Sequence, residues 1–167
     1  MAASLPAAAI DFGASNTDVV IHDGVTSRHW RLPSEGQPSD ARVRFALAQG
    51  QLTPADVCWM AVTGGNRTEL SAMLDGHAIH HVPEVQAIGR GGLALTGLER
   101  AVVASAGSGT AVVAAGPGLA KHVSGTGVGG GTLVGLARLL LGTVDPREID
   151  ALALHGMASM GSLRAVA

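Results

Sequence analysis

Residues 8–22, AAIDFGASNTDVVIH, decide the fold of this 167-residue chain. An apolar run leads to Asp11, a short turn of glycine and small polar residues follows, and a second apolar run completes the stretch. The pattern predicts two neighbouring strands joined by a tight turn. Asp23-Gly24 is a two-residue hairpin signal that returns the chain into a third strand, Val25 to Leu32. The chain therefore opens with a predicted antiparallel meander.

Beyond the meander, predicted helices alternate with predicted strands. Ser39 caps a helix that runs through Leu47 and that Gly50 stops, and Pro83 suits the first turn of a helix that runs towards Gly97. The other predicted helices, each stopped by a glycine, are Arg67 to Asp75, Thr132 to Leu141 and Asp145 to His155. The other predicted strands are Val57 to Thr63, Ala78 to Val82, Arg100 to Ala106, Ala111 to Ala115 and His122 to Ser124. This order predicts an α/β fold with a mixed sheet.

The composition narrows the class of protein. Hydrophobic residues make up 47% of the chain and charged residues 14%, so the chain can bury a core and is not a disordered segment. Two Trp, two Phe and no Tyr are too few aromatic residues for base stacking on single-stranded nucleic acid. A formal net charge of -2 also lacks the basic surface that phosphate backbones require. We therefore expect no nucleic-acid partner.

Cysteine usage and hydropathy indicate the compartment. The single cysteine, Cys58, excludes an intrachain disulfide and suits a reducing cytosol, and its apolar neighbours predict a buried, inert thiol. Met1 to Ile10 lacks the basic region and the apolar length of a signal peptide. No apolar run approaches the roughly 18 residues of a transmembrane helix. The sequence thus predicts a cytoplasmic protein without a membrane partner.

Three glycine-rich turns follow predicted strands, at residues 11–17 (DFGASNT), 107–110 (GSGT) and 125–132 (GTGVGGGT). Glycine lets the backbone approach a ligand closely and point successive N–H groups at an anion. The third turn also opens a predicted helix, whose N-terminus favours phosphate. Three such turns in a short chain predict a polyphosphate ligand. None is a Walker A loop, and the third misses the spacing of the dinucleotide fingerprint.

Asp11 is the candidate metal residue. It stands at the end of the first strand beside the first glycine turn, where a carboxylate can hold Mg²⁺ through water and so neutralise phosphates. The alternative is an aspartate that only stabilises the turn, but the company of Ser15, Asn16 and Thr17 favours the metal role. A histidine metal site is disfavoured, because the neighbouring residues His80-His81 point to opposite faces of a strand.

These motifs resemble those of a known superfamily. The pattern Asp-x-Gly-x-Ser/Asn-Thr at 11–17, followed by a strand and a hairpin, resembles the first phosphate loop of the actin, sugar-kinase and heat-shock-ATPase superfamily. Within that superfamily, residues 62–66, 107–110 and 125–140 are similar to type II pantothenate kinases, and the last of these motifs is long and rather specific. The resemblance runs from about Ile10 to His155.

The resemblance implies an incomplete two-lobed ATPase. Residues 1–100 would form a first lobe of the ribonuclease H-like, actin-type fold, 101–156 would open a second lobe, and 157–167 would be an irregular tail. The later strands and the adenosine-binding turn of the superfamily are missing from the sequence, so we expect impaired activity from this chain.

The resemblance also implies an activity. Type II pantothenate kinases use ATP and Mg²⁺ to phosphorylate the hydroxyl of pantothenate, the first step of coenzyme A synthesis. They are homodimers, and coenzyme A or acyl-CoA is the implied feedback ligand. The general base of the family matches Glu84, where a carboxylate at a strand end could accept the hydroxyl proton. The alternative is a glutamate that only complements the helix dipole after Pro83.

Matching positions supply the remaining implied site residues. Besides Asp11, the phosphate contacts would be Gly13, Ser15, Asn16, Thr17, Ser108, Gly109, Thr110, Gly129, Gly130, Gly131 and Thr132. The substrate contacts would be His122, Gly125 and Thr126. His122 stands where the family commonly has an arginine that holds pantothenate, and Asp18 where many members have a lysine. A second interpretation is therefore another kinase or ATPase of the superfamily, such as an amino-sugar kinase or an activator ATPase. A third is a non-catalytic remnant that binds nucleotide or coenzyme A.

Overall fold

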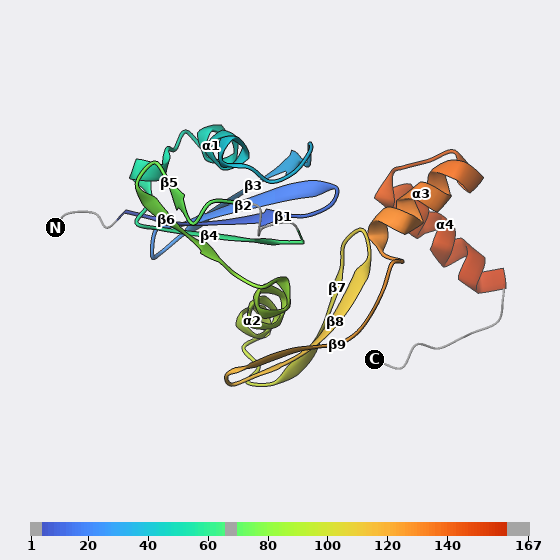
Figure 1. Cartoon of the computed structure of the whole chain (residues 1–167). Helices are drawn as coiled ribbons and strands as arrows, with labels where there is room; N and C mark the ends of the chain where they lie inside the picture. The colour runs from blue at the N-terminus through green and yellow to red at the C-terminus, as the bar shows by residue number, and fades with distance from the viewer. Residues whose placement is uncertain (1–4, 66–69, 160–167) are drawn as a thin grey trace. The chain divides into compact units, whose positions relative to one another are not determined.

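The computed structural model describes residues 5–65 and 70–159, and the side chains of the last helix as far as His155. In chain order the elements, labelled in Figure 1 except for the 3₁₀ helix η1, are β1 (Ala7–Phe12), β2 (Asn16–His22), β3 (Ser27–Pro33), α1 (Asp40–Gln49), η1 (Pro54–Asp56), β4 (Trp59–Gly64), β5 (Met73–Leu74), β6 (His77–His81), α2 (Glu84–Thr96), β7 (Ala101–Ala106), β8 (Thr110–Gly116), β9 (Leu119–Thr126), α3 (Gly130–Leu141) and α4 (Pro146–Ser159). They form two compact units, one of residues 1–105 and 112–124, the other of residues 106–111 and 125–167.

The first unit contains the predicted mixed sheet, with strand order β3-β2-β1-β4-β6-β5. The strands β1, β2 and β3 form the antiparallel meander, whereas β4 runs parallel to β1 and β6 parallel to β4. The predicted fold class is therefore confirmed. Because β1, β4 and β6 are parallel, their carboxyl ends lie at one edge of the sheet.

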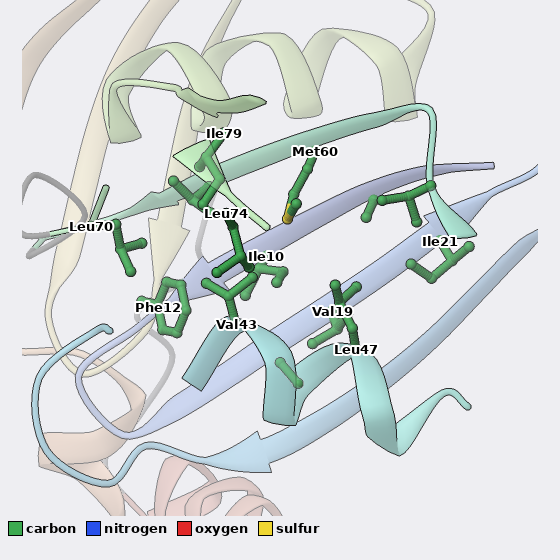
Figure 2. Close-up of a cluster of buried hydrophobic side chains, with 14 residues drawn as sticks. Ile10, Phe12, Val19, Ile21, Val43, Leu47, Met60, Leu70, Leu74 and Ile79 are labelled. Atoms are coloured by element: carbon green, nitrogen blue, oxygen red, sulfur yellow. The ribbon is translucent and has the colours of Figure 1, made fainter. Parts of the chain in front are cut away.

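One face of this sheet packs against α1 (Figure 2). Ile10 of β1, Val19 of β2 and both Val43 and Leu47 of α1 are no more than 1% exposed. Burial of an aliphatic side chain of this size contributes about 1.5–3 kcal/mol. Successive residues of a strand point to opposite faces, so Asp11, next to Ile10, lies on the face away from α1.

Helix α1 begins and ends where the sequence predicts. The Ser39 hydroxyl accepts a hydrogen bond from the backbone N–H of Arg42 at 3.3 Å. Gly50 ends the helix for a steric reason, because a Cβ there would lie 2.3 Å from the ring of Trp30. That ring donates its indole N–H to the carbonyl oxygen of Ala46 at 3.1 Å. The glycine thus lets β3 pack against the end of α1.

The hairpin between β2 and β3 is longer than the two-residue turn that was predicted. His22 pairs with Ser27, so four residues connect the strands. The Asp23 carboxylate accepts hydrogen bonds from the backbone N–H groups of Val25 and Thr26 at 2.9 and 2.7 Å, and from the Thr26 hydroxyl at 2.8 Å. The aspartate side chain therefore closes the turn, as Asp commonly does in loops.

The predicted helix from Arg67 to Asp75 is wrong over its described part. Residues 66–69 lie outside the described residues, and Met73–Leu74 form the strand β5, which pairs with β6. Asp75 and Gly76 both have positive φ, 51° and 83°. The Asp-Gly pair therefore makes a hairpin turn, and this turn signal outweighs the helical pattern before it.

Two further predictions need correction. Cys58 is exposed rather than buried; it precedes β4, whose first residue, Trp59, is itself 45% exposed, so burial in this strand begins only at Met60. Helix α4 does not stop at Gly156 but continues to Ser159, since an isolated glycine is tolerated inside a helix. The predicted irregular tail is thus helical as far as Ser159, and residues 160–167 lie outside the described residues.

The other sheet, of order β7-β8-β9, and the helices α2 and α3 follow the prediction. The glycines after both helices, Gly97 and Gly142, adopt left-handed conformations with φ of 70° and 74°. Apolar side chains of α3 are exposed, with Leu139 at 79% and Leu140 at 73%. No helix in the described part of the chain is long and apolar enough to cross a membrane.

Gly64, at the end of β4, can be substituted to test how closely the backbones of β4 and β1 approach each other. Its φ is 107°, and a Cβ there would lie 2.2 Å from the carbonyl oxygen of Phe12. Gly64→Ala should therefore lower the free energy of unfolding by more than about 3 kcal/mol in urea titrations followed by circular dichroism. Gly24→Ala is the control, because Gly24 also has a positive φ, 95°, but open space around it. It should cost only about 1–2 kcal/mol. Equal losses in the two variants would contradict the close approach.

Candidate active site

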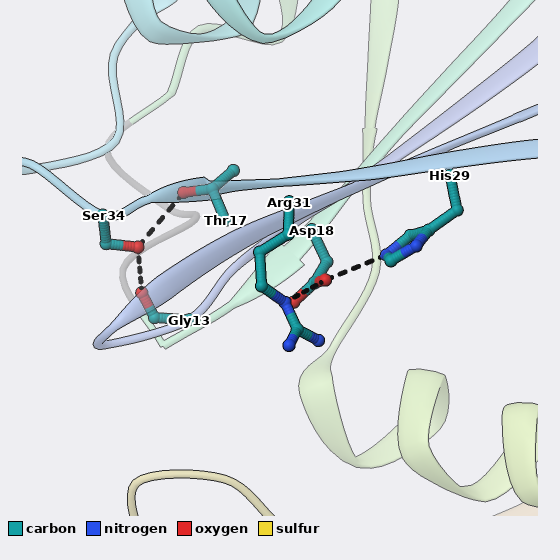
Figure 3. Close-up of polar contacts among 6 residues, drawn as sticks. All are labelled: Gly13, Thr17, Asp18, His29, Arg31 and Ser34. Carbon is teal, nitrogen blue, oxygen red and sulfur yellow. Dashed lines mark hydrogen bonds and ion pairs between the residues drawn. The ribbon is translucent and has the colours of Figure 1, made fainter. Parts of the chain in front are cut away.

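The first glycine turn joins β1 to β2 and is held from two sides. A Cβ on Gly13 would lie 2.7 Å from the carbonyl oxygen of Asn16, so the turn needs glycine at this position. The Ser34 hydroxyl donates to the Gly13 carbonyl at 2.7 Å and lies 3.1 Å from the Thr17 hydroxyl (Figure 3). The Ser34 N–H donates to the Ser15 carbonyl at 3.0 Å. The loop after β3 therefore supports the turn.

The residues of this turn differ in their access to a ligand. Ser15 and Asn16 are exposed at the surface of the turn. Thr17 is only 2% exposed, and its hydroxyl contacts Ser34. Thr17 therefore holds the loop against the turn. The sequence did not single out Ser34; the only signal for it is the run of turn-forming residues 33–39, PSEGQPS.

Strand register places a row of polar side chains on the face away from α1. Asp11 pairs with Asp18 on β2 and with Thr63 on β4, and Asp18 pairs with Arg31 on β3. Directly paired residues of neighbouring strands point to the same face. Four strands thus contribute one polar residue each at the level where β1 enters the glycine turn.

Asp18 is paired with two neighbouring side chains, Arg31 and His29. Arg31 donates from Nε to Asp18 Oδ1 at 2.8 Å, and His29 Nε2 lies 2.9 Å from the same oxygen (Figure 3). Burial alone would raise the pKa of Asp18, but hydrogen bonds from Arg31 and His29 outweigh it and hold the pKa below its usual value. Arg31 thereby brings a positive charge to the row.

Asp11 has a raised pKa. Partial burial raises the pKa of Asp11, and the negative charges of Glu84 and then of Asp18 raise it further. Glu84 is the exposed first residue of α2. The buried Thr63 Oγ1, on the strand beside Asp11, has no hydrogen-bond partner in the described part of the chain. A carboxylate with a raised pKa, paired in register with the strand residue that carries this oxygen atom, is compatible with a bound cation.

The protein alone offers few ligands for such a cation. Among residues 5–65 and 70–159, no three His, Cys, Asp or Glu side chains gather as a metal site. Mg²⁺ commonly keeps several waters and uses one or two carboxylates together with phosphate oxygens. Magnesium held by Asp11 through water therefore stays a prediction from the sequence.

A pocket of about 550 Å³ lies beside the turn, within the first unit. Its volume is in the range of small-molecule sites. The residues that line it are Phe12, Gly13, Ala14, Thr17, Ser34, Glu35, Gly36, Gln37, Pro38, Arg42, Gly65 and Glu84. The predicted base, Glu84, and part of the predicted phosphate turn thus share one cavity. Sequence analysis missed the loop 34–38 and Arg42, because nothing in the sequence shows that they face the turn.

The two glycine turns of the second unit pack against each other. Thr110 Oγ1 donates to the Val128 carbonyl at 2.8 Å, and Thr132 Oγ1 contacts one carbonyl oxygen in each turn, at 3.1 and 3.3 Å. A Cβ on Gly129 would lie 2.5 Å from the Gly109 carbonyl oxygen. These predicted phosphate residues therefore also hold the two turns together. The remaining predicted phosphate residues of this unit lie in the same two turns. Ser108 belongs to the turn at 107–110, and Gly130 and Gly131 are the first residues of α3.

The three predicted substrate residues are divided between the units. His122 is exposed on β9 in the first unit, whereas Gly125 and Thr126 belong to the second. The Thr126 hydroxyl accepts a hydrogen bond from the backbone N–H of Val128 at 3.2 Å. Neither unit by itself therefore gathers these three residues into a substrate site.

Comparisons with solved structures establish the fold. No protein-family model matches the chain, and no curated protein matches it either. The activator of 2-hydroxyisocaproyl-CoA dehydratase from Clostridium difficile, solved with bound ADPNP, matches with a TM-score of 0.61 and 20% identity over 97% of this chain and 59% of that one. A candidate N-acetylglucosamine kinase from Porphyromonas gingivalis matches with a TM-score of 0.54 and 20% identity over 89% of this chain and 62% of that one. The ethanolamine utilization protein EutJ from Carboxydothermus hydrogenoformans matches with a TM-score of 0.53 and 12% identity over 86% of this chain and 59% of that one.

The chain therefore has the actin-like ATPase fold, with its second lobe covered in part. It spans about three fifths of the length of each of these three structures. At identities of 20% and below, the likeness reaches the fold and not the substrate. It agrees with the fold that the resemblance implied and does not single out the pantothenate kinases.

The raised pKa of Asp11 predicts that the ionised Asp11 carboxylate lowers the stability of the folded protein when no ligand is bound. The folded protein holds the Asp11 proton more tightly than the unfolded chain, whose value is near 3.8, so stability falls as pH rises through the folded pKa. Asp11→Asn should therefore raise the melting temperature at pH 7 without ligand, and the gain should shrink as the pH falls towards about 4. Scanning calorimetry across this pH range measures it.

Asp23→Asn is the control of opposite sign. Hydrogen bonds from the backbone of Thr26 and Val25 and from the Thr26 hydroxyl lower the pKa of Asp23 to about 2. The stability that they provide is present above the unfolded value of 3.8 and is lost as pH falls through the folded value. Asp23→Asn should therefore lower the melting temperature at pH 7. A destabilised Asp11→Asn protein at pH 7 would show that the Asp11 carboxylate is compensated in the free protein.

Proposed function

We propose that the protein is an ATP-dependent phosphotransferase that phosphorylates a hydroxyl group of a small acceptor bound in the pocket. The pocket carries the proposal, because Gly13 and Ala14 of the first glycine turn line it together with Glu84. An enzyme that only hydrolysed ATP would need no acceptor cavity beside its phosphate turn. The actin-like fold, shared with a structure solved with ADPNP and with a candidate sugar kinase, supports ATP as the donor.

Glu84 is the proposed general base. As the acceptor oxygen forms its bond to the γ-phosphorus, the bond between that phosphorus and the bridging oxygen of ADP breaks, and the hydroxyl proton passes to the Glu84 carboxylate. Its exposure on the pocket wall supports this role. The negative charge of Glu84 contributes to the raised pKa of Asp11, which supports placing the proposed base and the proposed metal residue in one site.

The phosphate contacts are proposed for the glycine turns. In the first turn, backbone N–H groups together with exposed Ser15 and Asn16 would bind phosphate oxygens. The predicted contacts at the start of α3 stay a proposal for the second unit by itself, where the Gly131 N–H already donates to the Gly107 carbonyl at 3.2 Å. Asp11 would hold Mg²⁺ through water, and the bound ion would supply positive charge to the phosphates. That charge would also relieve the repulsion between Asp11 and Glu84.

Two acceptors are the first candidates. An amino sugar such as N-acetylglucosamine is suggested by the structural match to a candidate N-acetylglucosamine kinase. Pantothenate is suggested by the resemblance of residues 125–140 to type II pantothenate kinases. Both have hydroxyl groups and are small enough for the pocket volume.

Transfer of labelled phosphate from [γ-³²P]ATP to a panel of small polyols, amino sugars and hydroxy acids, pantothenate included, tests the proposal. The full chain should phosphorylate at least one of them in the presence of Mg²⁺. Glu84→Gln should lower that turnover by about 10²–10⁴-fold and leave ATP affinity nearly unchanged. Glu99→Gln, an exposed carboxylate just after α2, is the control and should turn over normally. Hydrolysis of ATP without transfer to any acceptor would refute the kinase and favour an ATPase.

A further inference from the structure

Arg42 is a largely buried cation in the wall of the pocket. Its side chain is 20% exposed, and its guanidinium lies 5.9 Å from the centre of the Phe45 ring. One terminal nitrogen donates to the Pro33 carbonyl at 3.1 Å, and the other donates to Glu35 Oε2 at 3.2 Å. These contacts hold the guanidinium at the pocket. A buried charge is costly without an anionic partner, so the identity of that partner matters.

Glu35 is a weakly held partner for such a cation. Its side chain is 77% exposed and makes a single long hydrogen bond to Arg42. It lies between β3 and α1, outside any helix or strand, and is followed by Gly36 with a φ of 69°. The neighbouring pair of Arg44 and Asp75 differs, with two hydrogen bonds of 2.9 and 2.7 Å. The Arg42 guanidinium therefore does not use its capacity for two parallel bonds to a carboxylate.

We propose that Arg42 binds a carboxylate of the acceptor and that Glu35 occupies this position until the acceptor displaces it. The inference rests on the proposed function, because it takes the pocket as the acceptor site, and it narrows the acceptor to a small hydroxylated carboxylate. Glu35 itself shows the chemistry that Arg42 accepts. A free carboxylate could make the two-bond geometry that Glu35 does not make. Glu84, which lines the same pocket, remains available to the acceptor hydroxyl.

Binding measured without nucleotide tests the inference. Isothermal titration of the full chain would compare three matched pairs: pantothenate with pantothenol, gluconate with sorbitol, and glucuronate with glucose. At least one carboxylate should bind about 10-fold or more tightly than its neutral counterpart, because a charged hydrogen-bonded pair replaces a neutral one. Arg42→Gln should abolish this preference. Arg42→Lys should retain part of it, since lysine keeps the charge but not the planar fork.

Glu35→Gln gives a signature that a purely structural role of Arg42 would not produce. Removal of the competing carboxylate should tighten carboxylate binding by about 3–10-fold and leave the neutral compounds unchanged. Arg44→Gln is the matched control, because this arginine lies on the same helix but is paired with Asp75 and does not line the pocket. It should alter neither affinity. If Arg42→Gln does not fold, the carboxylate affinities of Glu35→Gln and Arg42→Lys still show whether Arg42 binds the acceptor carboxylate.

Two results would overturn the assignment of Arg42. One is equal binding of every carboxylate and its neutral counterpart; the other is unchanged carboxylate affinity in Glu35→Gln. Because no nucleotide is present, these results are independent of phosphoryl transfer. If the chain binds carboxylates through Arg42 but phosphorylates none of them, the proposed binding site stands and the proposed kinase activity is refuted.

Discussion

The register of β1 between β2 and β4 is the constraint on which the rest of the structure depends. It directs Ile10 and Phe12 into the core, where they are 1% and 7% exposed, and it directs Asp11 to the opposite face. A slip of one residue would exchange these faces, exposing the core side chains and burying a carboxylate. The same hydrophobic packing against α1 that stabilises the first unit therefore also fixes where the candidate catalytic chemistry stands. The end of β1 then leads directly into the glycine turn.

Electrostatics distinguish the candidate site from ordinary surface polarity. Asp18 is hydrogen-bonded to Arg31 and His29, and its pKa is lowered. Asp11, directly opposite on β1, has a raised pKa because of partial burial and the charge of Glu84. Carboxylates with a perturbed pKa are concentrated at functional sites. Asp11 itself does not line the pocket, whereas Phe12 and Gly13, which follow it in the chain, do. In the proposed function, Mg²⁺ would bring positive charge to Asp11 and to the phosphates.

Much of the fold could be predicted from sequence because its signals are local. The alternation in residues 8–22, the Ser39 cap and the glycine turns each act over a few residues, and the structure confirms the meander, α1 and the turns. Predictions failed where a local signal was outweighed, as at the Asp75-Gly76 turn. The pocket could not be predicted, since Ser34 and Arg42 reach the glycine turn only through strand pairing and the packing of α1. Likewise, the pairing of Asp18 depends on cross-strand partners 11 and 13 residues away.

Binding of nucleotide phosphates by the turn after β1 can be tested with the backbone amide chemical shifts of the ¹⁵N-labelled full chain, recorded while Mg²⁺ and ADPNP are added. We expect saturable shift changes at the amides of residues 13–16, with smaller changes at the start of α2 around Glu84. Unchanged amide shifts in residues 13–16 at millimolar nucleotide, with the protein folded, would show that this turn does not bind the phosphates.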